Sequence, residues 1–243
     1  MPPEFILPDW PAPGRIRALS TTRVGGVSTA PWNSFNLGDH VEDDPAAVAR
    51  NRRILRQAAE LPAEPVWLEQ VHGCDVRTMD RNLCRADAGF TARPADVCAI
   101  LTADCLPVLF CADDGSAVAA AHAGWRGLAA GVLEQTLDCF PGAPSSIMAW
   151  MGPAIGPDAF EVGDEVRQAF VSRLPATAEA FVPAEPGKWL ADIWLIARLR
   201  LEQAGVGRVY GGGRCTFTEA ENFFSYRRDG RTGRMASLIW LAG

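Results

Sequence analysis

The sequence predicts a single-domain α+β fold, with mixed or antiparallel sheets and helices packed outside them. Short apolar runs bounded by turn residues are mixed with longer segments of helical spacing, without the strict strand-helix-strand alternation of a parallel sheet. The turn 113–116, Asp-Asp-Gly-Ser, joins two such runs as a hairpin. No G-x-G-x-x-G segment follows a predicted strand and opens a helix, so a dinucleotide-binding fold has no support.

Helices are expected where apolar residues recur every three or four positions. The segment after the Asp-Asp-Pro run has this spacing and an acidic N-cap, and it should turn Val48, Ile54, Leu55 and Ala58 inward. Gly205 is expected to end the last helix. Helices are predicted at 46–61, 128–140, 164–174 and 192–205.

Strands are expected in short apolar or β-branched runs bounded by Gly, Pro, Asn, Asp or Ser. The run 107–112 and the run 116–123 flank the hairpin turn and should pair with one another. Further strands are predicted at 66–73, 96–103, 146–152, 208–212 and 235–241. The chain shows no internal repeat or long linker, so one domain is expected to cover residues 1–243.

Composition narrows the class of function. The 243 residues are 48% hydrophobic and carry a formal net charge of -6, which argues against binding to nucleic acid or an anionic membrane. Small molecules are the expected partners. The first 14 residues resemble neither a signal peptide nor a membrane span, and the seven cysteines form no C-x-x-C pair. A cytoplasmic protein is therefore predicted.

Three strong metal-binding side chains lie at the ends of predicted strands, each beside a glycine or proline turn. They are His72, Cys105 and His122. Two imidazoles and a thiolate form a zinc site that leaves a fourth position open for water or substrate, as catalytic zinc sites do. Cys74 is a rival ligand because it follows His72 by two residues and would share its strand face. His40, among acidic residues, is expected to be solvated.

Two other chemistries use the same side chains. Copper also accepts two histidines and a cysteine, but a multicopper oxidase needs several centres and the chain has three histidines in all. Alternatively, Cys105 and His122 form a nucleophile and base, with Asp104 orienting or acidifying the pair. Separation along the chain does not decide between these possibilities.

Arginines and aromatic residues supply candidate binding groups. Arg126 lies in the turn after His122, where the first turn of the next helix would present free N–H groups to an anion. Arg23 precedes a Gly-Gly turn. The segment 214–236 gathers cysteine, aromatic and arginine side chains that could hold a nucleobase and an anion, although a solvated Asp-Gly hairpin explains it equally.

Eight motifs in one order carry a resemblance that extends from about residue 15 to the C-terminus. The chain resembles the YfiH family, also called laccase-domain or multicopper polyphenol oxidase proteins and, in some bacteria, peptidoglycan editing factors. Glu42 departs from the family pattern, which often has glycine at that position. The motifs are TTRVGGVS, FNLGDHVEDDP, QVHG, TADCLPV, AAAHAGWRG, MGPAIG, CTF and FFSYRRDGRTGRMA.

The resemblance implies an α/β sandwich similar to the catalytic domain of cytotoxic necrotizing factor, and zinc bound by His72, Cys105 and His122. It implies phosphorolysis of adenosine, inosine, guanosine and methylthioadenosine, together with adenosine deamination. The resemblance and the pattern of aromatic and arginine residues together predict two groups of site residues. Catalytic roles are expected for Asp104, Cys105, Arg126 and Arg227, and substrate binding for Arg23, Asn36, Cys215, Phe224 and Tyr226.

Within this resemblance, purine nucleoside and phosphate are the expected substrates and zinc the expected cofactor. Two alternatives remain. The older family name implies a copper-dependent polyphenol oxidase. The editing-factor name implies an amidase that acts on cell-wall precursors and uses Cys105 as nucleophile or ligand.

Overall fold

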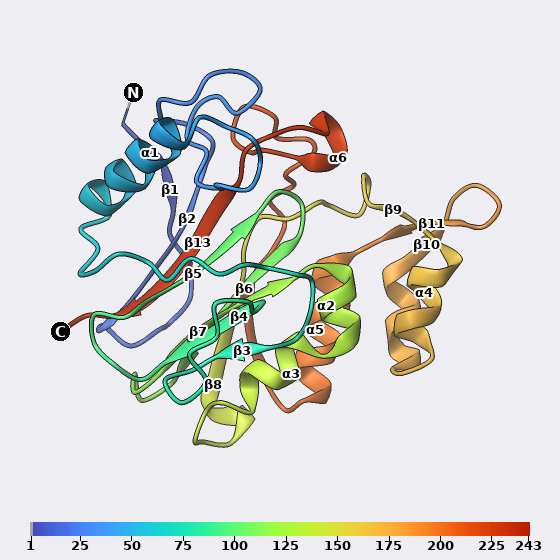
Figure 1. Ribbon diagram of the computed structural model, residues 1–243. Helices are drawn as coiled ribbons and strands as arrows, with labels where there is room; N and C mark the ends of the chain where they lie inside the picture. The colour runs from blue at the N-terminus through green and yellow to red at the C-terminus, as the bar shows by residue number, and fades with distance from the viewer. Residues whose placement is uncertain (1) are drawn as a thin grey trace.

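Two facing β-sheets form the centre of the molecule, and most helices cover their outer surfaces (Figure 1). The computed structural model describes residues 2–243. The four-stranded sheet has the order β1-β2-β13-β5, and the six-stranded sheet has the order β12-β8-β6-β7-β4-β3. The bounds are β1 Phe5–Ile6, β2 Ile16–Thr21, β3 Val76–Arg77, β4 Ala88–Thr91, β5 Val97–Thr102, β6 Leu106–Ala112, β7 Val118–Ala123, β8 Ile147–Met151, β12 Arg208–Gly211 and β13 Met235–Leu241.

Three apolar layers hold this arrangement together. Residues such as Ile100 and Ile239 of one sheet pack against Leu109 of the other. Helix α1 covers the outer face of the four-stranded sheet through Leu55, and the helices α2, α3 and α5 cover the six-stranded sheet. The helices are α1 Pro45–Ala58, α2 Trp125–Ala130, α3 Val132–Leu137, α4 Asp164–Val171, α5 Ile193–Gln203 and α6 Tyr226–Asp229.

A small third sheet, β10-β11-β9, lies beside α4 (Figure 1). Its strands are β9 Glu161–Gly163, β10 Phe181–Pro183 and β11 Lys188–Ala191. The molecule is therefore a single-domain α+β protein with mixed sheets, as the sequence predicted. Likeness to the cytotoxic necrotizing factor domain stays a prediction.

The hairpin at 113–116 is confirmed, since β6 and β7 pair antiparallel with Pro107 opposite His122. Helix α1 begins as expected, with the Asp44 side chain accepting from the N–H of Ala46. Val48 and Leu55 are buried, whereas Ala58, expected inside, is exposed. In the described part of the chain, seven strands were not predicted: β1, β2, β3, β4, β9, β10 and β11.

The predicted strand at 66–73 is wrong. This segment makes only isolated bridges at Val66 and Glu69. At its end, His72 has a φ of 60°, and the N–H groups of Val71, His72 and Gly73 bind the carboxylate of Asp87. Backbone groups that bind a side chain in this way cannot join a ladder of strands.

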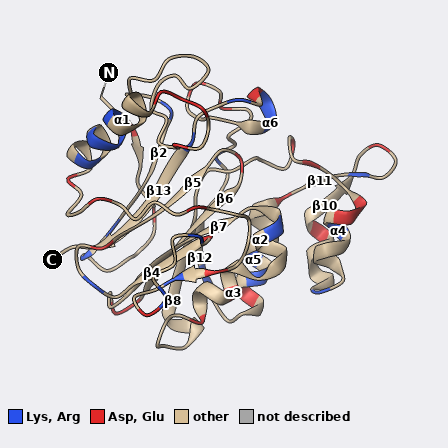
Figure 2. Ribbon diagram, viewed as in Figure 1, with Lys and Arg blue, Asp and Glu red and all other residues tan. Residues whose placement is uncertain are grey.

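The predicted helix at 128–140 is divided into two. Gly131, with a φ of 112°, ends α2 and begins α3. Helix α2 also starts three residues earlier than predicted, at Trp125. Basic and acidic residues are both spread over the loops, whereas the charged residues of α1 are all basic (Figure 2). Within residues 2–243, no helix has the length and apolar character needed to cross a membrane.

Candidate metal and active site

The fold brings His72, Cys105 and His122 together at one end of the six-stranded sheet. Cys105 lies in the turn before β6, and His122 lies near the end of the neighbouring strand β7. His72 comes from the loop before β3, and its Nε2 lies 3.9 Å from the Cys105 Sγ. The potential ligand atoms of the three side chains all lie within 4.8 Å of one another. His122 is buried and His72 is exposed, so one side of the group faces solvent.

Asp87, which sequence reasoning missed, holds both histidines. Its buried carboxylate accepts from the Nδ1 of His122 at 2.8 Å and from the backbone N–H of His72 at 2.9 Å. Burial raises the pKa of Asp87, but hydrogen bonds from His122, Gly73 and Val71 outweigh burial and hold that pKa below its usual value. Because Nδ1 of His122 is engaged, the Nε2 atom is the one available to a metal.

The donor set fits one zinc ion. Zinc bonds of about 2.0 Å to nitrogen and 2.3 Å to sulfur place tetrahedral donors about 3.3–3.6 Å apart, so the three side chains need only close in slightly. Gly124 makes room for them, since a Cβ there would lie 2.9 Å from the Cys105 Sγ and 3.0 Å from Cδ2 of His72. Cys74 is not part of the group and packs against the core instead.

Charge couples Cys105 to His122. Burial alone raises the pKa of the Cys105 thiol, but the positive charge of His122 and hydrogen bonds from both histidines lower it below its usual value. Burial lowers the pKa of His122, while Cys105 and Asp87 together raise it above its usual value. The metal-free site therefore favours a thiolate, which is the form of cysteine that binds metals.

Asp104 ties the segment 214–236 to the metal-binding residues. It is buried, has a φ of 88°, and directly precedes Cys105. Its carboxylate accepts from the Thr216 hydroxyl at 2.6 Å and from the backbone N–H of Arg227 at 2.7 Å. The side chain of Arg227 donates to the carbonyl of Glu161 and is exposed.

Arg234 is a cation beside the site that sequence reasoning did not select. Burial lowers its pKa, and the nearby negative charges of Cys105 and Asp104 act in the opposite direction. Its guanidinium lies 6.0 Å from the ring of Tyr226, which is 62% exposed. Its sequence signal was available, because Arg234 closes the GRTGRMA motif.

Three predicted binding residues support neighbouring loops. Arg23 donates to the carbonyls of Asn33 and Ala220 and lies over the ring of Phe224, which is buried. Asn36 is buried, and its side chain binds Gly38, Asp43 and the N–H of Arg234. Through these contacts, the loops that carry Arg23 and Asn36 are joined to the segment that contains Phe224 and Arg234.

Arg126 and Cys215 lie in other surroundings. Arg126 is exposed and stacks over Trp125 at 4.4 Å, on a helix of only six residues. Cys215 accepts from the N–H of Gly156 at 3.2 Å and lines a cavity of about 600 Å³ with Trp194. The expectation for His40 agrees with its exposure beside Asp39.

Glu42 adopts a conformation that suits glycine. Its φ is 63°, in the left-handed region, and its carboxylate pairs with Arg231 at 2.9 Å. This ion pair joins the loop before α1 to the loop after α6.

Residues 17–242 match the model of a family described as multi-copper polyphenol oxidoreductase laccase. The chain belongs to this laccase-like YfiH family. The matched range contains every candidate site residue. It also contains Asp87 and Arg234.

Similar proteins are known by name and by structure. The chain is 56% identical to "Purine nucleoside phosphorylase YfiH" of Escherichia coli over 98% of this chain and 99% of that protein. It is 56% identical to "Purine nucleoside phosphorylase PA4543" of Pseudomonas aeruginosa, covering 98% of each. The crystal structure of NMB0706 from Neisseria meningitidis matches with a TM-score of 0.94 at 52% identity, covering 98% of this chain and 99% of that chain. YlmD from Geobacillus stearothermophilus matches with a TM-score of 0.86 at 36% identity, over 95% and 93% of the two chains.

Proposed function

We propose that this protein is a zinc-dependent purine nucleoside phosphorylase that also deaminates adenosine. The observation that carries the proposal is the convergence of His72, Cys105 and His122 around one point with an exposed side. The names of the YfiH-family relatives supply the substrate class. Inosine, guanosine, adenosine and methylthioadenosine are the proposed nucleosides.

His72, Cys105 and His122 would hold the zinc ion. Bound zinc polarises oxygen groups and lowers the pKa of water. Asp87 fixes the ring of His122 through Nδ1 and the backbone of His72, so both histidines are oriented before any metal binds.

In phosphorolysis, a phosphate oxygen forms a bond to C1′ of the ribose while the bond from C1′ to N9 of the base breaks. Arg234 is the proposed phosphate-binding cation, because its guanidinium is partly shielded from solvent and the charges of Cys105 and Asp104 act on its pKa. One of its nitrogens donates to the carbonyls of Thr232 and Gly233, which holds the guanidinium in place. The exposed ring of Tyr226 beside it offers a face on which a purine can stack. The exposed guanidinium of Arg227 is a second candidate for the anion.

In deamination, water replaces the amino group of adenosine and ammonia leaves. Asp104 is the proposed proton shuttle. Two hydrogen bonds occupy one site on each of its carboxylate oxygens, and each oxygen keeps a further lone pair.

The test is an assay of purified zinc-loaded protein with each nucleoside, with and without phosphate. Ribose 1-phosphate and free base are expected from inosine only when phosphate is present, and inosine is expected from adenosine. The Cys105→Ser variant should lose metal and both activities. Zinc-loaded protein that forms neither product would reject the proposal.

A copper-dependent polyphenol oxidase is the second candidate, favoured by the description of the family. Its donor set would be the same two histidines and cysteine. The chain has three histidines in all, too few for several copper centres. Oxidation of a phenol by copper-loaded protein, with no nucleoside turnover by zinc-loaded protein, would favour this candidate.

The third candidate, an amidase acting on cell-wall precursors, is favoured by the proximity of the Cys105 sulfur to the ring of His122, with their ligand atoms within 4.8 Å of one another. Ligation and nucleophilic attack are separated by the Cys105→Ser variant. Loss of metal favours ligation, whereas retention of metal with loss of a covalent intermediate favours a nucleophile.

A further inference from the structure

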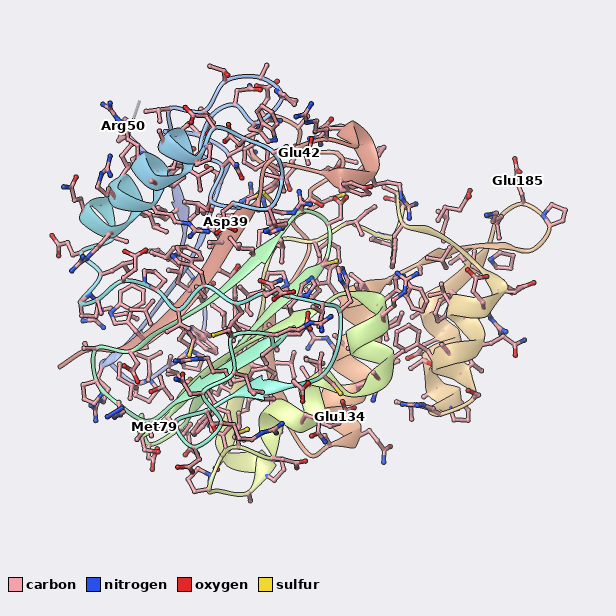
Figure 3. The ribbon with its side chains drawn as sticks, in the orientation of Figure 1. Asp39, Glu42, Arg50, Met79, Glu134 and Glu185 are labelled. Atoms are coloured by element: carbon pink, nitrogen blue, oxygen red, sulfur yellow. The ribbon has the colours of Figure 1, made fainter. Side chains whose placement is uncertain are left out.

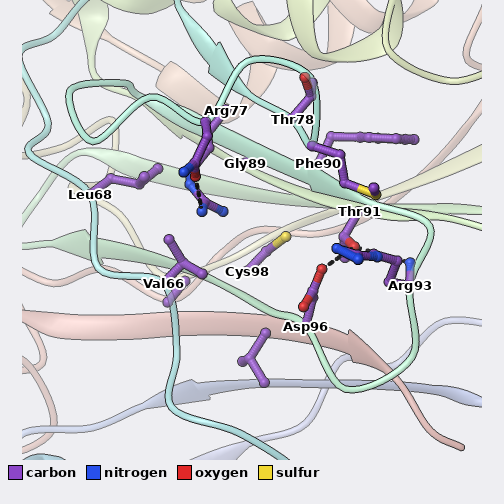
Figure 4. A pocket seen from close by; sticks show the side chains of 14 residues that line it. Val66, Leu68, Arg77, Thr78, Gly89, Phe90, Thr91, Arg93, Asp96 and Cys98 are labelled. Carbon is purple, nitrogen blue, oxygen red and sulfur yellow. Dashed lines mark hydrogen bonds between the residues drawn. The ribbon is translucent and has the colours of Figure 1, made fainter.

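A second cavity opens between the two sheets, away from the metal-binding residues. It has a volume of about 330 Å³ and lies where β4 of the six-stranded sheet passes β5 of the four-stranded sheet (Figure 4). The loop after β3 forms its other side. None of the three candidate metal ligands lines it. The volume is at the small end of the range for ligand pockets.

The inner wall of this inter-sheet cavity is apolar. Val66 and Leu68 contribute side chains to it, and the sulfur of Cys98 points inward (Figure 4). Burial raises the pKa of Cys98 to about 12, so the thiol is uncharged at neutral pH. The wall therefore favours the apolar part of a ligand and does not repel a negative charge.

Gly89 keeps the cavity open. This residue lies within β4, where a glycine often marks the close approach of a ligand or another backbone. A Cβ at Gly89 would lie 3.7 Å from the Cys98 Sγ, an ordinary contact, and its φ is outside the left-handed region. The backbone of β4 thus has no need of glycine, and a larger side chain would fill the space.

The rim carries two arginines without acidic partners. Within residues 2–243, neither Arg77 nor Arg93 forms an ion pair. Arg81 and Arg85, which lie on the same stretch of chain but outside the cavity, pair with acidic side chains at 3.3 Å and 3.7 Å. The guanidinium of Arg77 donates to the side chain of Asn82, which also lines the cavity. Of the four arginines between residues 77 and 93, the two that line the cavity are therefore the ones without an acidic partner.

The residues that line the cavity include one carboxylate, that of Asp96, against the two guanidinium groups. Asp96 accepts a hydrogen bond from the Thr91 hydroxyl at 3.0 Å. Met79, 60% exposed, adds an apolar side chain on the loop at the mouth (Figure 3). The mouth thus combines two cations with an exposed apolar group.

We propose that this inter-sheet cavity binds a small organic anion, with an apolar body against Val66, Leu68 and Cys98 and a carboxylate or phosphate on Arg77 and Arg93. Arginine pairs with both anions through parallel N–H bonds, which places the charged end at the rim and the body inside. The site is separate from the proposed nucleoside chemistry, and either can fail alone.

The test uses fluorine NMR with four probes and the zinc-loaded protein. Three anions, 4-fluorobenzoate, 6,6,6-trifluorohexanoate and 4-fluorophenyl phosphate, present the two head groups on aromatic or aliphatic bodies. The neutral 4-fluorobenzamide controls for apolar contact. At least one anion should bind saturably, about tenfold or more tightly than the neutral probe.

Variants then locate the binding. Gly89→Val, which fills the cavity, and Arg77→Ala, which removes a cation, should each weaken anion binding about tenfold or more. Arg81→Ala and Cys105→Ser should leave it unchanged. If circular dichroism shows that Gly89→Val does not fold, anion binding by Arg77→Ala decides the outcome. No saturable binding, equal binding of the neutral probe, or full binding by Arg77→Ala would overturn the proposal.

Discussion

Asp87 controls the geometry of both histidine ligands from a single carboxylate. The Asp87→Asn substitution replaces one acceptor oxygen by an NH₂ group and so loses bonds to either His122 or the 71–73 loop. We expect zinc affinity to fall about 10- to 100-fold. A competition titration with a chromophoric chelator measures the change. Asp75→Asn is the matched control, because Asp75 is exposed and pairs with Arg81. Equal zinc affinity in wild type and Asp87→Asn would contradict this role.

Arg234 and Arg126 differ in a way that kinetics can resolve. Hydrogen bonds to charged groups contribute about 1.5–3 kcal/mol, so Arg234→Ala should lower kcat/KM for phosphate roughly 10- to 100-fold in the proposed phosphorolysis. Arg126→Ala should change kcat/KM little, because Arg126 is exposed and stacks on Trp125. Arg234→Lys, which keeps the charge, should recover part of the loss. A larger loss in Arg126→Ala than in Arg234→Ala would reverse the assignment.

Helix α2 is fitted closely against the loop that carries His72. A Cβ at Gly127 would lie 2.7 Å from the carbonyl oxygen of Gly73, and backbone cannot move aside as a side-chain tip can. Gly127→Ala should displace this loop, lower zinc affinity about tenfold and cost about 1–3 kcal/mol of stability. Chelator competition and urea unfolding measure the two effects.

Gly131→Ala supplies the control for Gly127→Ala. Gly131 has a φ of 112°, at which a residue with a side chain is strained. The substitution should therefore lower the free energy of unfolding by roughly 1 kcal/mol or more. Its added Cβ would meet only Glu134, at 3.6 Å. Zinc affinity should therefore stay normal. Loss of zinc affinity in both variants would show that instability alone, and not the position of the His72 loop, explains the effect.

Local patterns predicted some elements and residues well and others poorly. The pairing of β6 with β7 follows from a four-residue turn, and this hairpin alone places Cys105 near His122. The strand predicted at 66–73 failed because its backbone binds Asp87, a residue 14 to 16 positions away. No local spacing announces such a long-range bond, so Asp87 itself was also missed.

Longer-range packing explains the remaining differences. Asn51 lies on α1 among apolar positions, yet it is buried because its side chain binds the backbone of Val27 and Asn36 and the hydroxyl of Ser28. A helical pattern cannot reveal partners contributed by another loop. Arg23, Asn36 and Arg126 lie in motifs of the same family pattern as the metal ligands, but their side chains bind the backbone, the carboxylate of Asp43 or the ring of Trp125. Motif membership alone does not show which contacts a side chain makes, and the predicted roles of these three residues stay predictions.

The metal site joins segments that are far apart in the sequence. His72 belongs to a loop, Cys105 to the turn before β6 and His122 to β7. Asp104 fastens the segment before β13 beside them. A ligand that binds only the folded chain raises its stability by an amount set by concentration over Kd. Zinc should therefore stabilise the whole molecule and not merely one loop.

Calorimetry on the metal-free protein can test this coupling. Free zinc at 1,000 times its Kd should add about 4 kcal/mol of stability, which for a chain of this size corresponds to a rise in Tm of roughly 8–16 °C. Cys105→Ser should abolish the rise, whereas Cys84→Ser, at an exposed position outside the site, should retain it. One transition that moves as a unit is expected. Two transitions, of which only one responds to zinc, would show that the site and the rest of the sandwich unfold independently.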